Sequence, residues 1–335
     1  MSAITTERNP INIGVVGTGH MGRYHINLLT KIIPNEYVYI YDVNTTLSSK
    51  IAKEYDVTRC SSYEELLSKV DAVVVVVPTC LHYEYSMQAM SANCHVLVEK
   101  PISDNLEHAQ LMMSYAEENN LILHIGHIER FNGAVQALRE FVDNPHYFQT
   151  QRIGSVSRIQ DVGVVLDLMI HDIDIILSLV DAPVKEVAAY GESIITNFED
   201  YALATLYFEN GVIASLTASR VSSYKARNII LSQEKNYIDL NYATNDLLIY
   251  RNQDNQYDIS QDQITYKEGH LVDRVFVHKD NPLKAELEYF LDDINNDISG
   301  DKYKNILWDA HSNLYTMEIA FKILQEIERN KKNRT

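Results

Sequence analysis

The feature that most constrains this chain is a glycine turn placed between a strand and a helix. An apolar run at Ile11–Val16 leads into Gly17–Gly22, which reads GxGxxG, and a helical segment follows at once. Gly17 would permit the tight turn, Gly19 the approach of a pyrophosphate, and Gly22 close packing of helix on strand. The residues expected to contact a cofactor here are Gly17, Gly19, His20, Met21 and Gly22. The pattern predicts a dinucleotide-binding domain.

An acidic residue extends this pattern. Asp42 follows the predicted strand Tyr37–Tyr41, twenty residues after Gly22. A carboxylate at this place accepts a hydrogen bond from the ribose 2′-hydroxyl, and its charge would repel a 2′-phosphate. No arginine follows in Val43–Thr45. The sequence therefore predicts NAD rather than NADP; an ordinary glycine turn beside a surface aspartate is the alternative.

The first half of the chain repeats a strand–helix rhythm. The predicted strands are Ile11–Val16, Tyr37–Tyr41, Ala72–Val77, Val96–Val98 and Leu121–Ile125, and the predicted helices include Glu64–Lys69, His82–Ser91 and Leu106–Asn119. The strands are rich in β-branched residues and do not alternate with polar ones, which is typical of strands buried on both faces. This predicts an α/β domain with a doubly wound parallel sheet, a Rossmann fold.

Two further loops should lie at the carboxyl ends of strands, where ligands bind in such sheets. Their candidate cofactor-binding residues are Pro78, Thr79, His82, Glu99 and Lys100. Because Pro101 cannot extend the strand, Lys100 should lie at an abrupt strand end. Its ammonium would donate to a substrate oxygen and to the nicotinamide ribose; a solvated lysine is the other reading.

A second motif lies in Val164–Val180, which is apolar around most of a helix and should be buried. The exceptions on one stripe are Asp167, His171, Asp174 and Ser178, whereas Asp172 falls off that stripe. Imidazole exchanges protons near neutral pH, so His171 is the predicted catalytic base, oriented by Asp167. A structural buried pair and a metal site are the alternatives. No third ligand is evident nearby, so we predict no metal.

After residue 145 the strand–helix rhythm stops. Strands are predicted at Tyr147–Ile153, Glu186–Ala189, Ala202–Phe208, Val212–Ser219, Arg227–Leu231, Tyr237–Leu240, Asp246–Tyr250 and Arg274–Val277. A hairpin signal at Glu209–Gly211 favours an antiparallel sheet. Helices at Pro282–Asn295 and Leu307–Glu328 should pack back on the nucleotide domain. The predicted domains are 1–126 for NAD, 127–305 for substrate and oligomerisation, and 306–335 for the returning C-terminal helix.

These motifs together resemble the glucose–fructose oxidoreductase/inositol dehydrogenase family (Gfo/Idh/MocA). The likeness rests on Gly17–Gly22, the Pro78-Thr79…His82 loop, Glu99-Lys100-Pro101 and Asp167…His171-Asp172, in the family's order. It implies a Rossmann domain followed by an α+β domain with a large, open, mostly antiparallel sheet. It also implies that Lys100, Asp167 and His171 surround the reacting carbon, that Pro101 is cis, and that the sheet forms a homo-oligomer face to face.

Two stretches resemble one subgroup of that family more closely. They are Gly126–Asn132 and Arg158–Val165, and the subgroup includes UDP-N-acetylglucosamine 3-dehydrogenases. The resemblance implies that Arg130, Asn132 and Arg158 bind substrate together with Lys100, Asp167 and His171. Local pairing of Arg130 with an acid such as Glu129 is the alternative.

Composition excludes several other classes. A net charge of −17 over 335 residues disfavours nucleic acid and anionic membranes as partners. The longest apolar run, Ala72–Val77, is too short to span a bilayer, and the polar start predicts no signal peptide. Three cysteines without CxxC spacing fit a reducing cytoplasm.

The sequence thus predicts an NAD-dependent dehydrogenase that oxidises a secondary hydroxyl of a sugar derivative, and the subgroup likeness points to the 3-hydroxyl of UDP-N-acetylglucosamine. A free polyol or inositol dehydrogenase is one alternative. A hydrolase or lyase that uses NAD transiently is a second, and an NAD-responsive binding protein without catalysis is a third. A proton acceptor such as His171 argues against mere binding.

Overall fold

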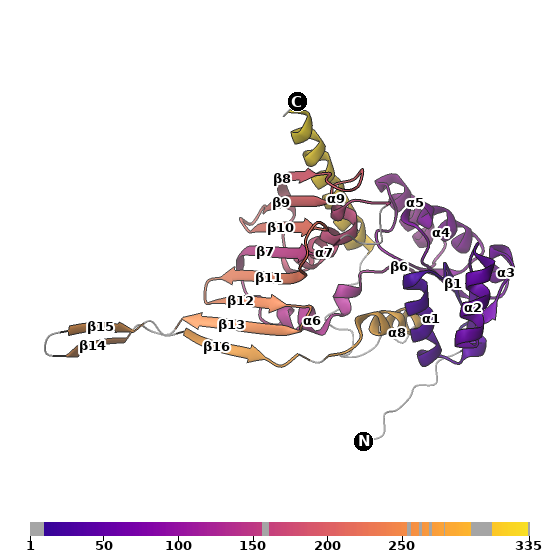
Figure 1. Cartoon of the computed structure of the whole chain (residues 1–335), viewed down its shortest axis with the longest axis horizontal. Coiled ribbons are helices and arrows are strands. Elements are labelled where there is room, and N and C mark those ends of the chain that lie inside the picture. The colour runs from indigo at the N-terminus through magenta and orange to yellow at the C-terminus, as the bar shows by residue number, and fades with distance from the viewer. Residues whose placement is uncertain are drawn as a thin grey trace, which may run out of the picture. The chain divides into compact units, whose positions relative to one another are not determined.

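A computed structural model describes residues 10–155, 161–252, 256–260, 263–267, 270–277, 279–295 and 310–333. They divide into two compact units (Figure 1). The first unit contains residues 10–131, 280–295 and 310–317, and the second contains the described residues of 132–279 together with 318–333. The predicted α/β fold with two different sheets is confirmed.

The first unit is built on a parallel sheet with strand order β3-β2-β1-β4-β5-β6. Its strands are β1 (Ile13–Val16), β2 (Val38–Tyr41), β3 (Thr58–Arg59), β4 (Ala72–Val75), β5 (His95–Val98) and β6 (Leu123–Ile125). Every residue of β1 and β4 is buried, as expected for strands covered on both faces. The strand order reverses between β1 and β4, which is the ligand-binding switch point of a doubly wound sheet. The short, exposed edge strand β3 was not predicted.

The α-helices of this unit differ in whether a side chain caps their start. They are α1 (His20–Ile32), α2 (Thr45–Tyr55), α3 (Tyr63–Leu67), α4 (His82–Ser91), α5 (Leu106–Glu118) and, from late in the chain, α8 (Pro282–Ile294). The side chains of Asn44, Ser62 and Asn105 each accept from the amide three residues later. Each such cap stabilises a helix by about 1 kcal/mol.

Helix α8 completes the core of the first unit. Its Leu287 and Phe290 are fully buried in one cluster with Ile26 and Leu29 of α1. The sequence correctly placed this helix on the nucleotide domain. The predicted boundary at residue 305 is nevertheless wrong for 280–295, because the apolar face of α8 belongs to the first core.

The second unit carries an eight-stranded sheet with strand order β16-β13-β12-β11-β7-β10-β9-β8. Its strands are β7 (Pro145–Ile153), β8 (Val184–Glu192), β9 (Tyr201–Phe208), β10 (Ile213–Ser219), β11 (Ala226–Gln233), β12 (Asn236–Asn241), β13 (Asp246–Asn252) and β16 (His270–Val275). Neighbouring strands are antiparallel except β7 and β10. The predicted hairpin joins β9 to β10, with Gly211 at φ +87°. A separate pair, β14 (Gln256–Ser260) and β15 (Gln263–Lys267), was not predicted.

The helices of the second unit are α6 (Gly133–Arg139), a π-helical turn η4 (Val165–Met169) that continues into α7 (Ile170–Leu179), and most of α9 (Ala310–Lys332). Here too the predicted domains need correction, because residues 318–333 of α9 belong with the second sheet. Asn330 donates to the carbonyl of Ala189 in β8, over 2.9 Å. Buried Ile327 fills the space that a side chain at Gly191 would need.

Candidate active site

The glycine turn between β1 and α1 requires glycine at two of its positions. Gly17 has φ +94°, and a Cβ there would lie 2.3 Å from the carbonyl oxygen of Val76. A Cβ on Gly22 would lie 1.9 Å from the carbonyl oxygen of Gly17. Exposed Gly19 has no heavy atom within 4 Å of its Cβ position, so a ligand can approach the backbone there. This cradle fits the pyrophosphate of a dinucleotide.

His20 and Met21 form the start of α1, and within the described residues no side chain caps this helix at Gly19. The ring of His20 is exposed and lies edge-on to Tyr24, with centroids 4.9 Å apart. Uncapped amides at a helix start bind anions, because the helix dipole is positive there. The local geometry therefore suits the cofactor role predicted for this turn.

Asp42 lies directly after β2 and is tied to the glycine turn. The amide and hydroxyl of Thr18 both donate to Asp42 Oδ2, over 2.6 and 2.9 Å, and the amide of Asn44 donates to Oδ1 over 2.8 Å. These bonds hold a carboxylate beside the turn, and a carboxylate in this place suits a ribose with a free 2′-hydroxyl better than a 2′-phosphate.

The loops that follow β4 and β5 are joined by His82. Its Nε2 lies 2.9 Å from the carbonyl oxygen of Val77, and its Nδ1 lies 2.8 Å from that of Pro101. Pro78 and buried Thr79 begin the short 3-10 turn η2 (Thr79–Leu81) that leads to this histidine. The structure thus brings together the two loops that the sequence placed at neighbouring strand ends.

Glu99 is the first residue after β5 and begins the second loop, and it has a partner that the sequence did not reveal. His25 Nε2 of α1 lies 2.8 Å from Glu99 Oε1, with both residues buried. Burial raises the pKa of Glu99, but the hydrogen bond and charge of His25, together with the charges of Lys100 and His82, outweigh it, so the net pKa lies below the ordinary value. The next residue, Lys100, is half-buried, and its bond to Pro101 is cis, as the family resemblance implied.

The substrate-binding residues predicted near the end of the first unit lie in two different structural elements. Arg130 is buried in the 3-10 turn η3 (Ile128–Phe131). Asn132 caps α6, since its Oδ1 accepts from the amide of Ala134 over 3.0 Å, and its Nδ2 donates to the carbonyl of Tyr242 over 3.4 Å. These bonds give Asn132 a structural role within its own unit. Arg158 lies outside the described residues.

The helix of the second unit has the buried polar residues that its sequence predicted. Asp167, His171 and Asp174 are 3%, 8% and 3% exposed, whereas Ser178 is half-buried and accepts from Arg139 over 2.8 Å. The helix differs from the prediction at its start, because η4 is π-helical rather than α-helical. Such turns occur frequently at functional sites.

Asp172 lay off the predicted stripe, yet it is fully buried. Its Oδ1 accepts from Nε and Nη2 of Arg152 on β7, over 3.2 and 3.1 Å, and from the hydroxyl of Tyr242 over 2.8 Å. The arginine lies 5.0 Å from the centre of the Tyr242 ring. Asp172 thus anchors the helix to the sheet. The signal for it was Arg152, a cation on the buried face of an alternating strand.

Two further kinds of feature are absent from the described residues. These residues contain no group of three His, Cys, Asp or Glu side chains placed to hold a metal ion. None of the described helices has the length and apolarity needed to cross a bilayer.

Comparison with known proteins agrees with this arrangement. Residues 11–127 match a family model described as "Oxidoreductase family, NAD-binding Rossmann fold", and residues 125–238 match the GFO/IDH/MocA C-terminal domain. The UDP-N-acetylglucosamine 3-dehydrogenase of Acidithiobacillus ferrooxidans is 36% identical over 239 residues, which are 71% of this chain and 76% of that protein. Its solved structure superposes with TM-score 0.82 and 30% identity, and covers 95% of this chain and 98% of that one.

Two further relatives are more distant. The scyllo-inositol 2-dehydrogenase (NAD(+)) of Bacillus subtilis is 27% identical over 234 residues, which are 64% of this chain and 68% of that protein. A levoglucosan dehydrogenase solved with NADH and levoglucosan has TM-score 0.79 at 16% identity, over 95% of this chain and 97% of that one. That second likeness concerns the fold alone.

Proposed function

Because the chain belongs to the GFO/IDH/MocA oxidoreductase family and is an NAD-dependent dehydrogenase of a sugar derivative, we propose that its substrate is a UDP-linked N-acetyl sugar, oxidised at the 3-hydroxyl. The observation that carries this proposal is the likeness to UDP-N-acetylglucosamine 3-dehydrogenase, which extends over 95% of the chain and therefore includes both units. A likeness limited to the nucleotide domain would have carried no information on the substrate.

The first unit holds the cofactor. The amides of the Gly17–Gly22 turn and the start of α1 bind the pyrophosphate, and Asp42 accepts from the adenosine ribose. NAD, when bound, supplies the acceptor for the hydride that leaves the sugar carbon. His82 fixes the two loops that follow β4 and β5, and Lys100 at the second loop donates to the substrate oxygen.

His171 takes the proton of the sugar hydroxyl while the carbon loses its hydride. An imidazole suits this task because its ordinary pKa lies near neutral pH. Asp167 precedes His171 by four residues on the same helix, and both are buried. We propose that its carboxylate orients the imidazole and stabilises the imidazolium that forms.

The test is NADH formation from NAD with a panel of UDP-linked sugars, free sugars and inositols. We expect NADH with UDP-N-acetylglucosamine, and no signal when the sugar lacks the nucleotide. Activity on free inositol alone would contradict the proposal and favour the polyol alternative. Substrate cleavage without net NADH would instead identify a hydrolase or lyase that uses NAD transiently.

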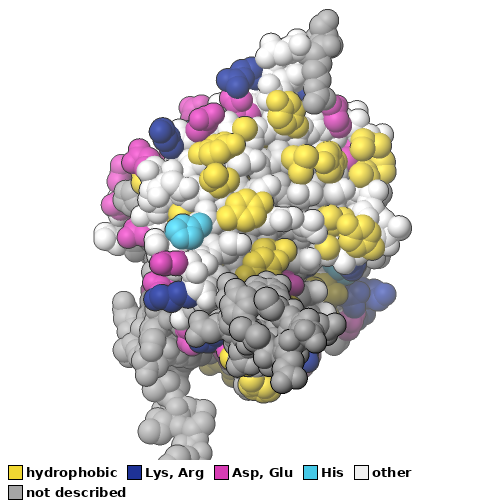
Figure 2. All heavy atoms as spheres, turned by 90° about the vertical axis from the view of Figure 1, so that its left-hand side faces the viewer, with side chains coloured by type: hydrophobic (Ala, Val, Ile, Leu, Met, Phe, Trp, Pro, Cys, Tyr) yellow, Lys and Arg dark blue, Asp and Glu magenta, His cyan; other side chains and the backbone are white. Residues whose placement is uncertain are grey.

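We also propose that the chain forms a homo-oligomer through the outer face of its second sheet. Leu203 and Tyr207 on β9, Ile213 on β10 and Tyr237 on β12 are between 37% and 39% exposed. The register places Ile213 directly beside Tyr207. Figure 2 shows hydrophobic side chains gathered on the side of the molecule where this sheet lies. A partner that buried them would remove an apolar surface from water.

Light scattering on the purified protein tests the oligomer. We expect a mass that is a multiple of 38.4 kDa. The double variant Leu203→Asp/Tyr207→Lys should reduce this mass to that of a single chain. A native mass of one chain would contradict the proposal.

The three free cysteines, of which Cys80 is exposed, support a reducing location, and we propose the cytoplasm.

A further inference from the structure

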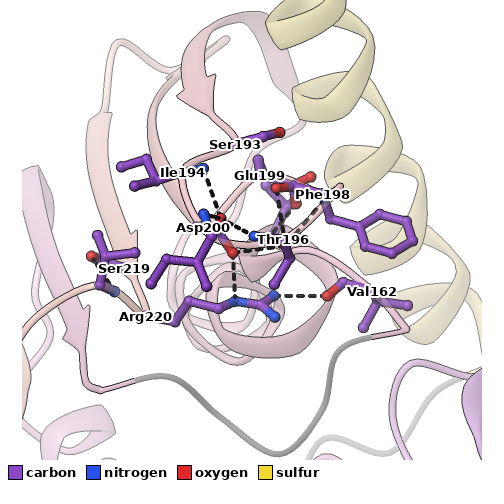
Figure 3. A network of polar contacts seen from close by, with 12 residues as sticks. Val162, Ser193, Ile194, Thr196, Phe198, Glu199, Asp200, Ser219 and Arg220 are labelled. Carbon is purple, nitrogen blue, oxygen red and sulfur yellow. Dashed lines mark hydrogen bonds and ion pairs between the residues drawn. The ribbon is translucent and has the colours of Figure 1, made fainter.

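A cluster of charged residues lies at the start of the helix that carries Asp167 and His171 (Figure 3). From it we infer that Glu199 is a positioning residue for the reaction, which acts by fixing where the π-helical turn begins. The inference rests on the proposed function, because it concerns the placement of the proposed base. Glu199 itself comes from a different part of the sequence, on the loop between β8 and β9.

Glu199 binds the first amides of this helix with two different groups. Its backbone carbonyl accepts from the amide of Val164 over 2.9 Å, and its carboxylate Oε1 accepts from the amide of Val165 over 3.0 Å. Amides at a helix start have no partner within the helix, so such bonds determine where the helix begins. The helix then continues with the amide of Asp167 donating to the carbonyl of Gly163 over 2.9 Å.

The contact between Glu199 and Gly163 has no spare room. A Cβ added to Gly163 would lie 2.0 Å from Oε1, 2.1 Å from Cδ and 2.2 Å from Oε2 of Glu199. The carboxylate therefore lies against the Cα atom of Gly163, and any side chain there would displace it. This packing fixes the chain two residues before the π-turn and four residues before Asp167.

The loop that carries Glu199 is itself held rigidly. The Oδ2 atom of the next residue, Asp200, accepts from the amides of Ile194, Ile195 and Thr196, over 2.8, 2.6 and 2.8 Å. Fully buried Arg220 joins this loop to the segment just before the helix. Its backbone amide donates to the carbonyl of Asp200 over 2.9 Å, and its Nη2 donates to the carbonyl of Val162 over 2.7 Å.

A carboxyl group is a costly choice for a purely structural cap at this place. Glu199 is 8% exposed, and burial raises its pKa although the amide of Val165 opposes the shift. Burying a carboxyl group costs free energy unless its hydrogen bonds offset the loss of water. The start of an ordinary helix could be capped by a small hydroxyl side chain or stabilised by an apolar contact. Glu199 instead supports a π-helical turn, which changes the direction in which the following side chains point. The side chains concerned are Asp167 and His171.

The experiment uses the full-length protein, NAD and the sugar that gives NADH. The variants are Glu199→Ala, Glu199→Gln, Gly163→Ala and the double variant Gly163→Ala/Glu199→Ala. The control is Glu209→Ala, which removes an exposed glutamate from the β9–β10 turn of the same unit. We measure kcat, the dissociation constant of NAD, and hydrogen exchange of the amides of Val164 and Val165.

We expect Glu199→Ala to lower kcat by about 10²-fold, as a small misplacement of a reacting group does. The NAD dissociation constant should stay within twofold, since the cofactor turn lies in the other unit. Glu199→Gln should recover most of kcat, because its amide oxygen also accepts from Val165. Gly163→Ala should match Glu199→Ala, and the double variant should be no worse than either one.

A kcat within threefold of wild type in folded Glu199→Ala would overturn the inference, and so would losses that multiply in the double variant. If Glu199→Ala does not fold, Gly163→Ala decides the matter, and full activity in that variant overturns the inference. Failure of the proposed function is distinguishable, because wild type would then oxidise no sugar. Hydrogen exchange would still report on the contact: the amide of Val165 should lose protection in Glu199→Ala and keep it in Glu209→Ala, whereas the amide of Val164 keeps its backbone acceptor in both variants.

Discussion

Residues of the proposed cofactor site in the first unit are held by bonds between neighbouring strand ends, whereas the helix with His171 in the second unit is held by buried side chains of other elements. In the first unit Thr18 donates to Asp42, and His82 joins the ends of β4 and β5. In the second unit the helix is fixed by Asp172 bonding to Arg152 and Tyr242, and by Glu199 at its start.

This difference shows two ways of preorganising a site. A parallel sheet brings its strand ends together by topology, so each loop needs only a glycine, a proline or one side chain to take its place. A helix that packs on a sheet is not positioned by strand ends in this way. It needs buried polar bonds to fix its rotation about its axis and the residue at which it begins. Changes to the first unit should therefore affect cofactor binding locally, and changes to the second should affect catalysis or stability.

The largest expected effect is that of His171→Ala. Loss of the proposed base should lower kcat by about 10²- to 10⁴-fold. The dissociation constant of NAD, measured by fluorescence titration, should not change, because the cofactor residues belong to the other unit. His146→Ala, at an exposed histidine on β7, is the control. Unchanged turnover in His171→Ala would remove this histidine from the mechanism.

Asp172→Ala should have the next largest effect, on stability. It leaves the fully buried guanidinium of Arg152 without its carboxylate partner. Breaking one side of a buried ion pair costs about 3–5 kcal/mol in the free energy of unfolding. The double variant Arg152→Met/Asp172→Leu should recover most of this loss in urea unfolding. A cost below 1 kcal/mol (roughly the value of an exposed pair) would show that the helix is not held in this way.

Asp42→Ser should have a smaller and purely local effect. It removes the carboxylate that accepts from Thr18 and from the ribose, so NAD should bind about tenfold more weakly, which is about 1.4 kcal/mol. NADP should gain relative to NAD, because the charge that repels a 2′-phosphate is gone. Calorimetric titration with both cofactors measures the ratio. An unchanged preference would contradict the role given to Asp42.

Glu286→Gln tests a buried carboxyl group in the core region of the first unit. Burial, and then the charge of Glu99, raise the pKa of Glu286 on α8 well above its ordinary value. The folded state therefore retains the proton as pH rises, while the unfolded state releases it, so wild-type stability falls above the unfolded pKa.

The Gln variant lacks this loss. It should be more stable than wild type at pH 8 and equal to it at pH 4. Thermal unfolding across that pH range, with Glu288→Gln as the control on the same helix, measures the difference. A gain that does not change with pH would mean that Glu286 is not protonated in the fold.

The sequence predicted best the parts that follow local rules. An apolar run predicted the buried strand β4, and a helical pattern predicted the bounds of α4. The spacing of the glycines predicted the turn. The burial of Asp167 and His171 followed from an apolar helix with a polar stripe. In each case, neighbouring residues alone determine the structure.

The missed features depend on partners that are distant in the sequence. Nothing near Asp172 indicates Arg152, and nothing near Val165 indicates Glu199, which lies 34 residues away. His25 pairs with Glu99 across 74 residues. The π-turn was also not predicted, because the polar stripe was derived by assuming the constant rotation per residue of a regular α-helix.

The late position of α8 has a consequence for synthesis of the chain. A ribosome that has released residues 10–131 has made every strand of the first sheet, but the apolar side of α1 stays uncovered until Leu287 and Phe290 emerge. At ordinary elongation speed this interval is on the order of 10–30 s. The nascent nucleotide domain therefore exposes an apolar surface to solvent during this interval. A truncated gene ending near residue 131 should yield an insoluble product.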